Sequence, residues 1–170
     1  GISAPIIAWL TPITDDLGAA VRNDIDIAVP SREHLHAVLD AGDRVNEVPR
    51  IHLEIDTGMS RGGALLEWNE LLADAATAQA SGRVRIVGIW SHFARADEPG
   101  HSFNIEQRER FTNALEEARK LGITPKIVHL SNSAATLNDP ASHFDVVRLG
   151  IAMYGLSPDV KTMGDSEKLN

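Results

Sequence analysis

The feature that most constrains the fold is a regular alternation between short apolar runs and amphipathic helical patterns along the 170 residues. Six runs rich in β-branched and apolar residues are predicted strands: Pro5–Leu10, Ile25–Val29, Ile51–Asp56, Val84–Ser91, Lys126–Ser131 and Val146–Tyr154. Their nearly continuous hydrophobicity is typical of strands that are covered on both faces. Strands that alternate with helices indicate βα units and a parallel sheet.

Helical patterns fill most of the intervals between these runs. The expected helices are Thr14–Val21, a helix from the Ser31 cap to Gly42, a helix from Leu65 to about Gly82, and a helix from Asn104 to Gly122. Ser31 is a preferred capping residue, and Asn104 and Gln107 have the spacing of a capping box. A glycine near the end of each of the last three patterns is a typical stop signal.

Six βα-like units predict an α/β fold in a single domain over residues 1–170. Two architectures fit: an open doubly wound sheet, or an incomplete parallel (βα) barrel of the TIM type with about six of eight βα units. A closed eight-stranded barrel typically needs about 250 residues, so this chain is roughly 80 residues short. Periodicity alone does not choose between the two.

Charge and composition exclude several classes of function. Lysine and arginine number 16 against 24 acidic residues, and a net charge of −8 argues against nucleic acid or an anionic membrane as a general partner. The sequence has no cysteine, which excludes disulfides and thiol catalysis. The seven histidines have no metal-binding spacing, so no metal site is expected. No apolar run is long enough to span a membrane and the first residues lack a signal-peptide pattern, so a cytoplasmic enzyme is expected.

Active sites in parallel α/β folds lie at the carboxyl ends of the strands, so the residues that follow each strand are the candidates for chemistry. Arg61 lies in the glycine-rich segment Asp56–Gly63, where a guanidinium can bind a carboxylate through two hydrogen bonds. The alternative is a glycine-rich turn with a solvated arginine. After the fourth strand, His92 is either a site residue or a core histidine.

Two later junctions carry candidate ligand-binding residues. Asn132 and Ser133 offer an amide, a hydroxyl and backbone N–H groups where a helix begins, which suits a phosphate group, although a plain helix N-cap is the commoner use. Arg148 stands inside an apolar run, where a buried arginine is costly unless it is paired or contacts a ligand. A structural salt bridge with Asp145 or Asp56 is the alternative for Arg148.

Four ordered blocks of this sequence closely resemble the alanine racemase family. The blocks are IHLEIDTGMSRGG, VGIWSHFARADEP, HLSNSAAT and VVRLGIAMYGLSP, and the resemblance runs from about Ile6 to Pro158. The family uses pyridoxal 5′-phosphate (PLP) to interconvert L- and D-alanine for peptidoglycan precursors. Its N-terminal domain is a (βα)8 barrel, so the resemblance implies that this chain is an internal fragment with the third to eighth strands and without the C-terminal β domain.

The resemblance also implies roles for the residues that would hold the cofactor. Arg148 resembles the arginine that hydrogen-bonds the pyridine nitrogen of PLP. Asn132 and Ser133, with the backbone of Gly150 and Ile151, resemble part of the phosphate site. A cationic donor leaves the ring nitrogen unprotonated, and the ring then accepts electrons more weakly, which favours quick reprotonation over transamination.

The remaining matched residues surround the substrate and the ring. Arg61 resembles the arginine that holds the substrate carboxylate and orients a tyrosine base, so it is a catalytic candidate together with His92. His92 and His129 resemble the histidines packed around the ring and its arginine. Many family members have a lysine, often carbamylated, where this chain has Glu54, and our hypothesis is that the Glu54 carboxylate contacts Arg61 directly.

The family's Schiff-base lysine and its tyrosine base have no counterpart among the four lysines and Tyr154. We therefore expect this chain alone to be inactive, with PLP absent or bound non-covalently, and to form a homo-oligomer that covers its open sheet edges. Three alternatives remain open: a non-racemising PLP-binding barrel, a module that binds phosphate ligands non-covalently, and an open α/β domain with an unrelated ligand.

Overall fold

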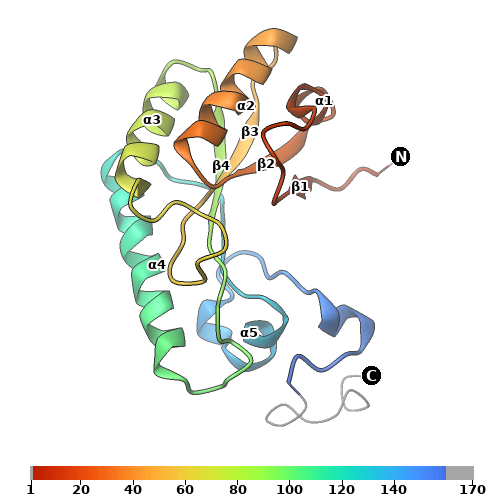
Figure 1. Ribbon diagram of the computed structural model, residues 1–170, viewed down its shortest axis with the longest axis vertical. Coiled ribbons are helices and arrows are strands. Elements are labelled where there is room, and N and C mark those ends of the chain that lie inside the picture. The colour runs from red at the N-terminus through yellow and green to blue at the C-terminus, as the bar shows by residue number, and fades with distance from the viewer. Residues whose placement is uncertain (1, 160–170) are drawn as a thin grey trace.

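The computed structural model describes residues 2–159 of the chain. Its strands are β1 (Ile6–Ala8), β2 (Ile25–Val29), β3 (Arg50–Glu54), β4 (Arg85–Trp90) and β5 (Ile127–His129). All neighbouring strands pair in parallel, in the order β1-β2-β3-β4-β5, and the sheet curls like half of a barrel (Figure 1). A doubly wound sheet has a point where the strand order reverses, and this sheet has none. The parallel α/β prediction is confirmed, in its incomplete-barrel form.

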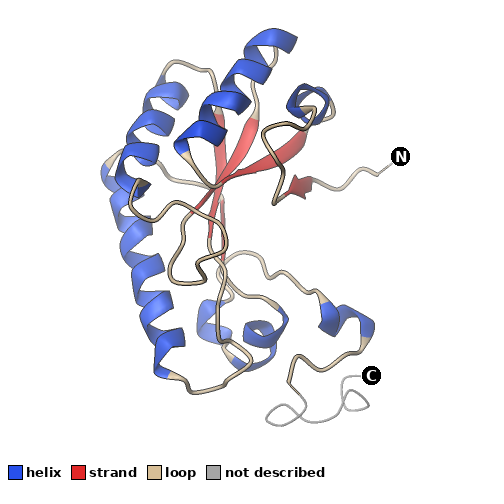
Figure 2. Cartoon of the chain, in the orientation of Figure 1, coloured by secondary structure: helices blue, strands red, loops and turns tan. Residues whose placement is uncertain are grey.

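Helices follow the strands and cover one side of the sheet. They are α1 (Leu17–Arg22), α2 (Arg32–Val45), α3 (Trp68–Ala80), α4 (Ser102–Lys120) and α5 (Ser133–Asn138), with short 3-10 helices η1 (Pro140–Ser142) and η2 (Ile151–Tyr154). Figure 2 shows α2, α3 and α4 along the outer side of the strands, while α5 and η2 lie beyond the carboxyl ends. No helix within residues 2–159 combines the length and the apolar composition required to cross a bilayer.

The sheet has two chemically different faces because successive side chains of a strand point in opposite directions. The outer face, which packs on the helices, carries Ile27, Val29, Ile51, Leu53 and Ile89. The inner face, which lines the hollow of the curl, carries Asp26, His52, Glu54, Trp90 and His129. All of these inner-face residues are buried, each no more than 4% exposed.

The predicted sixth strand, Val146–Tyr154, is wrong. The N–H of Asp145 donates to the Val128 carbonyl oxygen (3.0 Å), and the Asp145 carboxylate accepts the Val128 N–H (2.8 Å). The Asp145 side chain therefore occupies the place beside β5 where the backbone of a sixth strand would pair with Val128. Gly150, with φ −101° and ψ −102°, then turns the chain into η2, so this apolar run does not extend the sheet, and residues 2–159 contain five strands.

Several helix ends also differ from the sequence pattern. The first helix begins later than expected, at Leu17. Helix α2 continues through Gly42, and Asn46 ends it in the left-handed conformation (φ 55°). Helix α3 begins at Trp68, and α4 begins directly after His101, whose side chain accepts the N–H two residues later. Local capping chemistry therefore overrode the glycine stop signal in α2 and the capping-box spacing in α4.

Candidate functional site

Arg148 is the centre of a group of side chains at the carboxyl ends of the strands. Its NH1 group donates to Nδ1 of His129 (2.8 Å). Its NH2 group donates to the carbonyl oxygens of Ser91 (2.7 Å) and Leu130 (3.0 Å) and lies 3.3 Å from Nδ1 of His92. The guanidinium is therefore fixed by groups from two neighbouring strand ends, β4 and β5.

The Arg148 guanidinium donates to carbonyl oxygens and histidine nitrogens and not to Asp145 or Asp56. The alternative of a structural salt bridge with one of these aspartates is therefore wrong. Burial lowers the pKa of Arg148 to about 10, with Arg61 adding to the shift and Glu54 opposing it. Arg148 is thus still a cation at neutral pH. Its Nε is buried and has no hydrogen-bond partner within residues 2–159.

Two tryptophans and a histidine form an aromatic wall beside Arg148. The Arg148 guanidinium carbon lies 4.7 Å from the ring centroid of Trp90 and 5.4 Å from that of Trp9. Trp90 stacks on Trp9 (centroids 5.5 Å apart) and on His129 (5.6 Å). Cation–π contacts of this kind hold a guanidinium while leaving its N–H groups available. The tryptophans were not among the predicted site residues, since nothing local in the sequence distinguishes them from core residues.

Ser133 and Gly150 form a small polar cradle where α5 begins. The Ser133 hydroxyl oxygen accepts the Gly150 N–H (2.8 Å) and, more weakly, the Ala152 N–H (3.4 Å). Asn132 is the N-cap of α5, and its side-chain oxygen accepts the Ala135 N–H (3.1 Å). The capping interpretation therefore holds for Asn132, while Ser133 is buried and ties two segments together.

His92 is partly buried beside Arg148, so the structure places it at the site rather than in the core. Burial, together with the nearby Arg148 and Arg61 charges, lowers the pKa of His92 to about 4. The imidazole is therefore neutral at pH 7 and can accept or donate a hydrogen bond. The side chains of His92 and His129 approach the same guanidinium from different strand ends.

Gln107 holds the segment that carries His92, a role that the sequence analysis missed. Its side-chain amide donates to the His92 carbonyl oxygen (3.1 Å) and to the Thr57 hydroxyl (3.1 Å), and it accepts the Ala94 N–H (2.8 Å). Gln107 is fully buried inside α4, one turn before Phe111 in the apolar stripe. A polar residue at a stripe position is the signal that could have identified it.

Arg61 and Glu54 do not form the direct contact that we expected. Within the described residues, neither an ion pair nor a hydrogen bond joins them; Arg61 is exposed and Glu54 is buried below Gly62. Burial raises the pKa of Glu54 to about 7. The charges of Arg61 and Arg148 oppose this rise, so Arg61 acts on Glu54 electrostatically and without direct contact. The hypothesis of a direct contact is therefore wrong for this structure.

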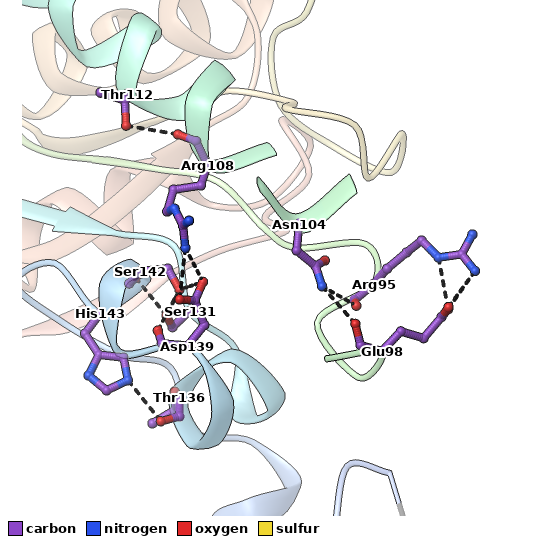
Figure 3. Close-up of polar contacts among 10 residues, drawn as sticks. All are labelled: Arg95, Glu98, Asn104, Arg108, Thr112, Ser131, Thr136, Asp139, Ser142 and His143. Carbon is purple, nitrogen blue, oxygen red and sulfur yellow. Dashed lines mark hydrogen bonds and ion pairs between the residues drawn. The ribbon is translucent and has the colours of Figure 1, made fainter. Parts of the chain in front are cut away.

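A polar network between α4 and α5 supports the backbone at the site. Arg108 on α4 forms an ion pair with Asp139 (2.8 Å), and the Ser142 hydroxyl donates to the same carboxylate (2.8 Å; Figure 3). Ser131 donates to the Ser142 carbonyl oxygen (2.7 Å) and accepts the backbone N–H of Arg148 (3.0 Å) through its own carbonyl. The position of Arg148 thus depends on contacts that begin on a distant helix.

A pocket of about 330 Å³ opens beside Arg148. The predicted site residues in its lining are His92, Asn132, Ser133, Arg148, Gly150 and Ile151, and Trp9 joins them. His129 stands behind Arg148 rather than in the lining, and Glu54 and Arg61 lie outside it. The lining joins the Arg148 cation, a hydroxyl, an amide, aromatic surface and the Asp97 carboxylate, and the cation with the aromatic surface suits a flat ligand with an anionic group.

Comparison with known proteins gives consistent matches. The family model for the N-terminal domain of alanine racemase matches residues 1–158. The alanine racemase of Salinispora tropica is 48% identical over 159 residues, which are 93% of this chain and 43% of that protein. The alanine racemase structure from Streptomyces lavendulae has a TM-score of 0.95 at 40% identity and covers 99% of this chain and 44% of its own.

A second solved structure, the Bacillus anthracis alanine racemase with bound L-Ala-P, has a TM-score of 0.80 at 34% identity and covers 94% of this chain and 41% of its own. The chain thus spans less than half the length of the relatives that it matches. The family match includes every residue that lines the pocket. This chain belongs to the alanine racemase N-terminal domain family.

Proposed function

We propose that the chain forms the PLP-binding barrel part of an alanine racemase that interconverts L- and D-alanine. The observation that carries the proposal is Arg148, whose NH1 and NH2 groups are held by the protein while its buried Nε has no partner among the described residues. Leaving a buried donor unpaired costs about 1–3 kcal/mol. An acceptor on a ligand in the pocket removes that cost, and the pyridine nitrogen of PLP is such an acceptor.

The cradle and the local charge also fit the cofactor. At Gly150, an added Cβ would point to within 3.7 Å of the Ser133 hydroxyl oxygen, so the missing side chain leaves room where the cradle faces the pocket. The pocket lining holds the Arg148 cation and the Asp97 carboxylate, with Arg61 outside the lining, and the nearby Glu54 is partly protonated near neutral pH because burial raises its pKa to about 7. The Arg148 cation, in a chain with a net charge of −8, favours an anionic phosphate ester.

PLP, when bound, supplies an electron-accepting ring that loosens the Cα–H bond of an amino acid. Arg148 would donate a hydrogen bond to the ring nitrogen and keep its own proton, since burial lowers its pKa only to about 10. Such a donor would limit how strongly the ring withdraws electrons. His129 fixes the guanidinium, and neutral His92 packs beside it.

For the substrate, we propose that Arg61 binds the alanine carboxylate. Arg61 is exposed and has no ion-pair or hydrogen-bond partner among the described residues, so its guanidinium is available. The loop that carries it is shaped by Asp56, whose carboxylate accepts the N–H groups of Gly58 (2.8 Å) and Ser60 (3.1 Å). Glu54 acts on Arg61 through its charge rather than through contact.

We also propose that a polypeptide of these 170 residues does not racemise alanine by itself. In the family, a lysine and a tyrosine exchange the α-proton on opposite faces of the substrate. Lys120, Lys126 and Tyr154 are exposed, and Lys161 and Lys168 lie outside the described residues. A coupled assay for D-alanine should detect no turnover. Turnover, or PLP that borohydride fixes to the chain, would contradict this proposal.

Titration with two vitamin B6 phosphates tests the binding proposal. PLP and pyridoxine 5′-phosphate share the ring and the phosphate, but only PLP has the aldehyde needed for a covalent bond. Similar affinities indicate non-covalent binding. The Arg148→Gln variant should weaken both ligands by about tenfold or more, because a hydrogen bond from a charged donor contributes about 1.5–3 kcal/mol. The control is Arg119→Gln, on the exposed end of α4.

Two outcomes would redirect the proposal. If the wild-type chain binds neither ligand, the cofactor-binding part of the proposal fails. If inorganic phosphate competes with both ligands and Arg148→Gln has no effect, the site is a phosphate-binding module that does not use the ring nitrogen. The cradle of Ser133 and Gly150 favours that second candidate function, since it needs no lysine.

We further propose a cytoplasmic homo-oligomer. Strand β1 is an open edge of the described sheet, whereas Asp145 occupies part of the β5 edge, and an unpaired edge favours pairing with another chain. Exposed apolar side chains lie near one edge, among them Ile6, Trp9 and Leu10. Light scattering should give a mass of at least twice 18.4 kDa, and a monodisperse monomer would reject the oligomer.

A further inference from the structure

A continuous hydrogen-bond network runs along the inner face of the sheet, away from the pocket. His129, which accepts from Arg148, places its Nε2 2.9 Å from Nδ1 of His52 on β3. Nε2 of His52 lies 3.3 Å from the Asp26 carboxylate on β2. Asp26 in turn accepts from Nε of Arg50 (2.6 Å). We call these five residues the inner-face network.

The chemistry of its two ends fixes every proton in the network. An arginine side chain can only donate, so His129 must accept at Nδ1 and carry its proton on Nε2. That proton is donated to Nδ1 of His52, which must then carry its own proton on Nε2 and donate it to Asp26. Any other placement sets two donors or two acceptors against each other.

The charges agree with this assignment. Burial alone would raise the pKa of Asp26, but the hydrogen bonds from His52 and Arg50 outweigh it and lower the pKa, so Asp26 is a carboxylate. Burial, together with the Arg148 charge, lowers the pKa of His129 to about 2, so His129 is neutral. The exposed fractions of Asp26, His52 and His129 are 2%, 3% and 2%, so these side chains are largely shielded from bulk water, although they border an apolar pocket of about 270 Å³.

Gly88 makes the connection between β3 and β5 possible. Strand β4 lies between them, and Gly88 is the residue that pairs with His52, directly after a register shift in the β3–β4 ladder. A Cβ at Gly88 would overlap the His52 ring at Nδ1 and Cε1. The His52 ring therefore passes over β4 at Gly88, where any residue other than glycine would place a side chain in the space that the ring occupies.

We propose that Asp26 and His52 are positioning residues that fix the tautomer of His129 and thereby hold Arg148, and that Gly88 provides the passage. The purpose of the arrangement rests on the proposed function, because Arg148 is the residue assigned to the ring nitrogen. Without Asp26, His52 can carry its proton on Nδ1 and donate it to Nε2 of His129, and the His129 proton then moves to Nδ1, where it meets the Arg148 N–H groups donor to donor. The guanidinium then loses the contact that orients it.

The test uses the full chain without ligand, labelled with ¹⁵N in the histidine rings. In the wild type, His129 and His52 should each show an unprotonated Nδ1 and a protonated Nε2; His129→Asn and His52→Asn assign the signals. In Asp26→Asn and Gly88→Ala, the two His129 nitrogen signals should move toward each other as both tautomers become populated. Asp24→Asn is the matched control, since Asp24 also pairs with Arg50 but is exposed and outside the network.

A second measurement is the affinity for pyridoxine 5′-phosphate, which should fall by up to about tenfold in Asp26→Asn and Gly88→Ala and stay unchanged in Asp24→Asn. The proposal is overturned if wild-type His129 carries its proton on Nδ1 or populates both tautomers, a result that needs no variant to fold. It is also overturned if the folded Asp26→Asn protein keeps the wild-type tautomer. If the wild type binds no ligand, the proposed function fails, while the tautomer result still decides the network.

Discussion

The two faces of the sheet are built from alternate residues of the same strands, yet they have opposite chemistry. On β3, Ile51 and Leu53 are fully buried among helix side chains, whereas His52 and Glu54 between and after them are buried among polar and charged groups. The named side chains on both faces are buried, but only the inner face leads to the pocket. Burial by itself therefore does not separate residues that stabilise the fold from residues that position the site.

The comparison implies that the two faces respond differently to substitution. Apolar residues on the outer face contribute to the free energy of unfolding through packing, which is insensitive to pH. Buried polar residues on the inner face contribute through hydrogen bonds and charge, which depend on protonation. The following substitutions test this difference, in order of decreasing effect.

Leu53→Ala should have the largest effect, because it removes a fully buried outer-face side chain. We expect a loss of about 2–5 kcal/mol in the free energy of unfolding, measured by denaturant titration, with unchanged ligand affinity in the folded protein. The matched control is Leu66→Ala, since Leu66 is 95% exposed. A stability loss as small as that of the control would mean that the outer face is not the main source of stability.

Glu54 should produce a pH effect of up to about 3 kcal/mol. Its pKa is raised to about 7 in the folded chain against about 4.5 when unfolded, so the folded state binds the extra proton. The stabilisation is complete below pH 4.5 and is lost as the pH rises through about 7. Glu54→Gln removes this loss, so the variant should gain stability relative to wild type between about pH 5 and pH 8.

Denaturant titrations at several pH values measure the difference between wild type and Glu54→Gln, which cancels the contribution of the histidines. Glu116→Gln, at an exposed position of α4, is the control and should follow the wild type. A constant difference across this pH range would show that Glu54 is ionised in the folded protein. The inner face would then be no more sensitive to pH than the outer face.

Gln107→Ala tests the connection between the helix layer and the site. It leaves the Ala94 N–H and the His92 carbonyl oxygen without their partner, so we expect a loss of about 1–3 kcal/mol in unfolding free energy. The His92 ring signals should shift in an NMR spectrum of the folded variant. Asn113→Ala on the exposed side of α4 should change neither quantity.

Ser133→Ala should have the smallest effect, a loss of about 1 kcal/mol in the binding of pyridoxine 5′-phosphate, which is roughly fivefold in affinity. The hydroxyl is one of several groups in the cradle, so binding weakens without disappearing. Isothermal titration calorimetry measures the change. Ser102→Ala, at the exposed start of α4, serves as the control, and an equal effect in both variants would exclude Ser133 from the binding site.

The outer face and the location of the site could be predicted from the sequence because both follow from local patterns. Runs such as Ile25–Val29 are apolar enough to identify as buried strands, and the carboxyl-end rule then directs attention to His92, while the cost of burying an arginine in an apolar run singles out Arg148. The apolar run at Val146–Tyr154 failed as a strand for a local reason that hydropathy does not contain, namely the Asp145 carboxylate on the β5 edge.

The inner-face network could not be predicted, because its members are far apart in the sequence. Asp26 and His52 look like isolated polar residues within apolar runs, and only the parallel register and the gap at Gly88 bring them to His129. The error over Glu54 has a similar origin. The family resemblance suggested the pair, because glutamate is anionic like the carbamylated lysine that many members have at this position, whereas the loop conformation after β3 decides whether the two groups touch.

The Ser133 hydroxyl has a consequence for which form of a ligand the pocket selects. A hydroxyl oxygen has two lone pairs, and those of Ser133 already receive the N–H groups of Gly150 and Ala152. The hydroxyl can therefore offer a guest only its hydrogen. An unprotonated phosphoryl oxygen can accept that hydrogen, whereas a P–OH group pointed at the same atom cannot, so a singly charged phosphate monoester must turn one of its two unprotonated oxygens toward Ser133.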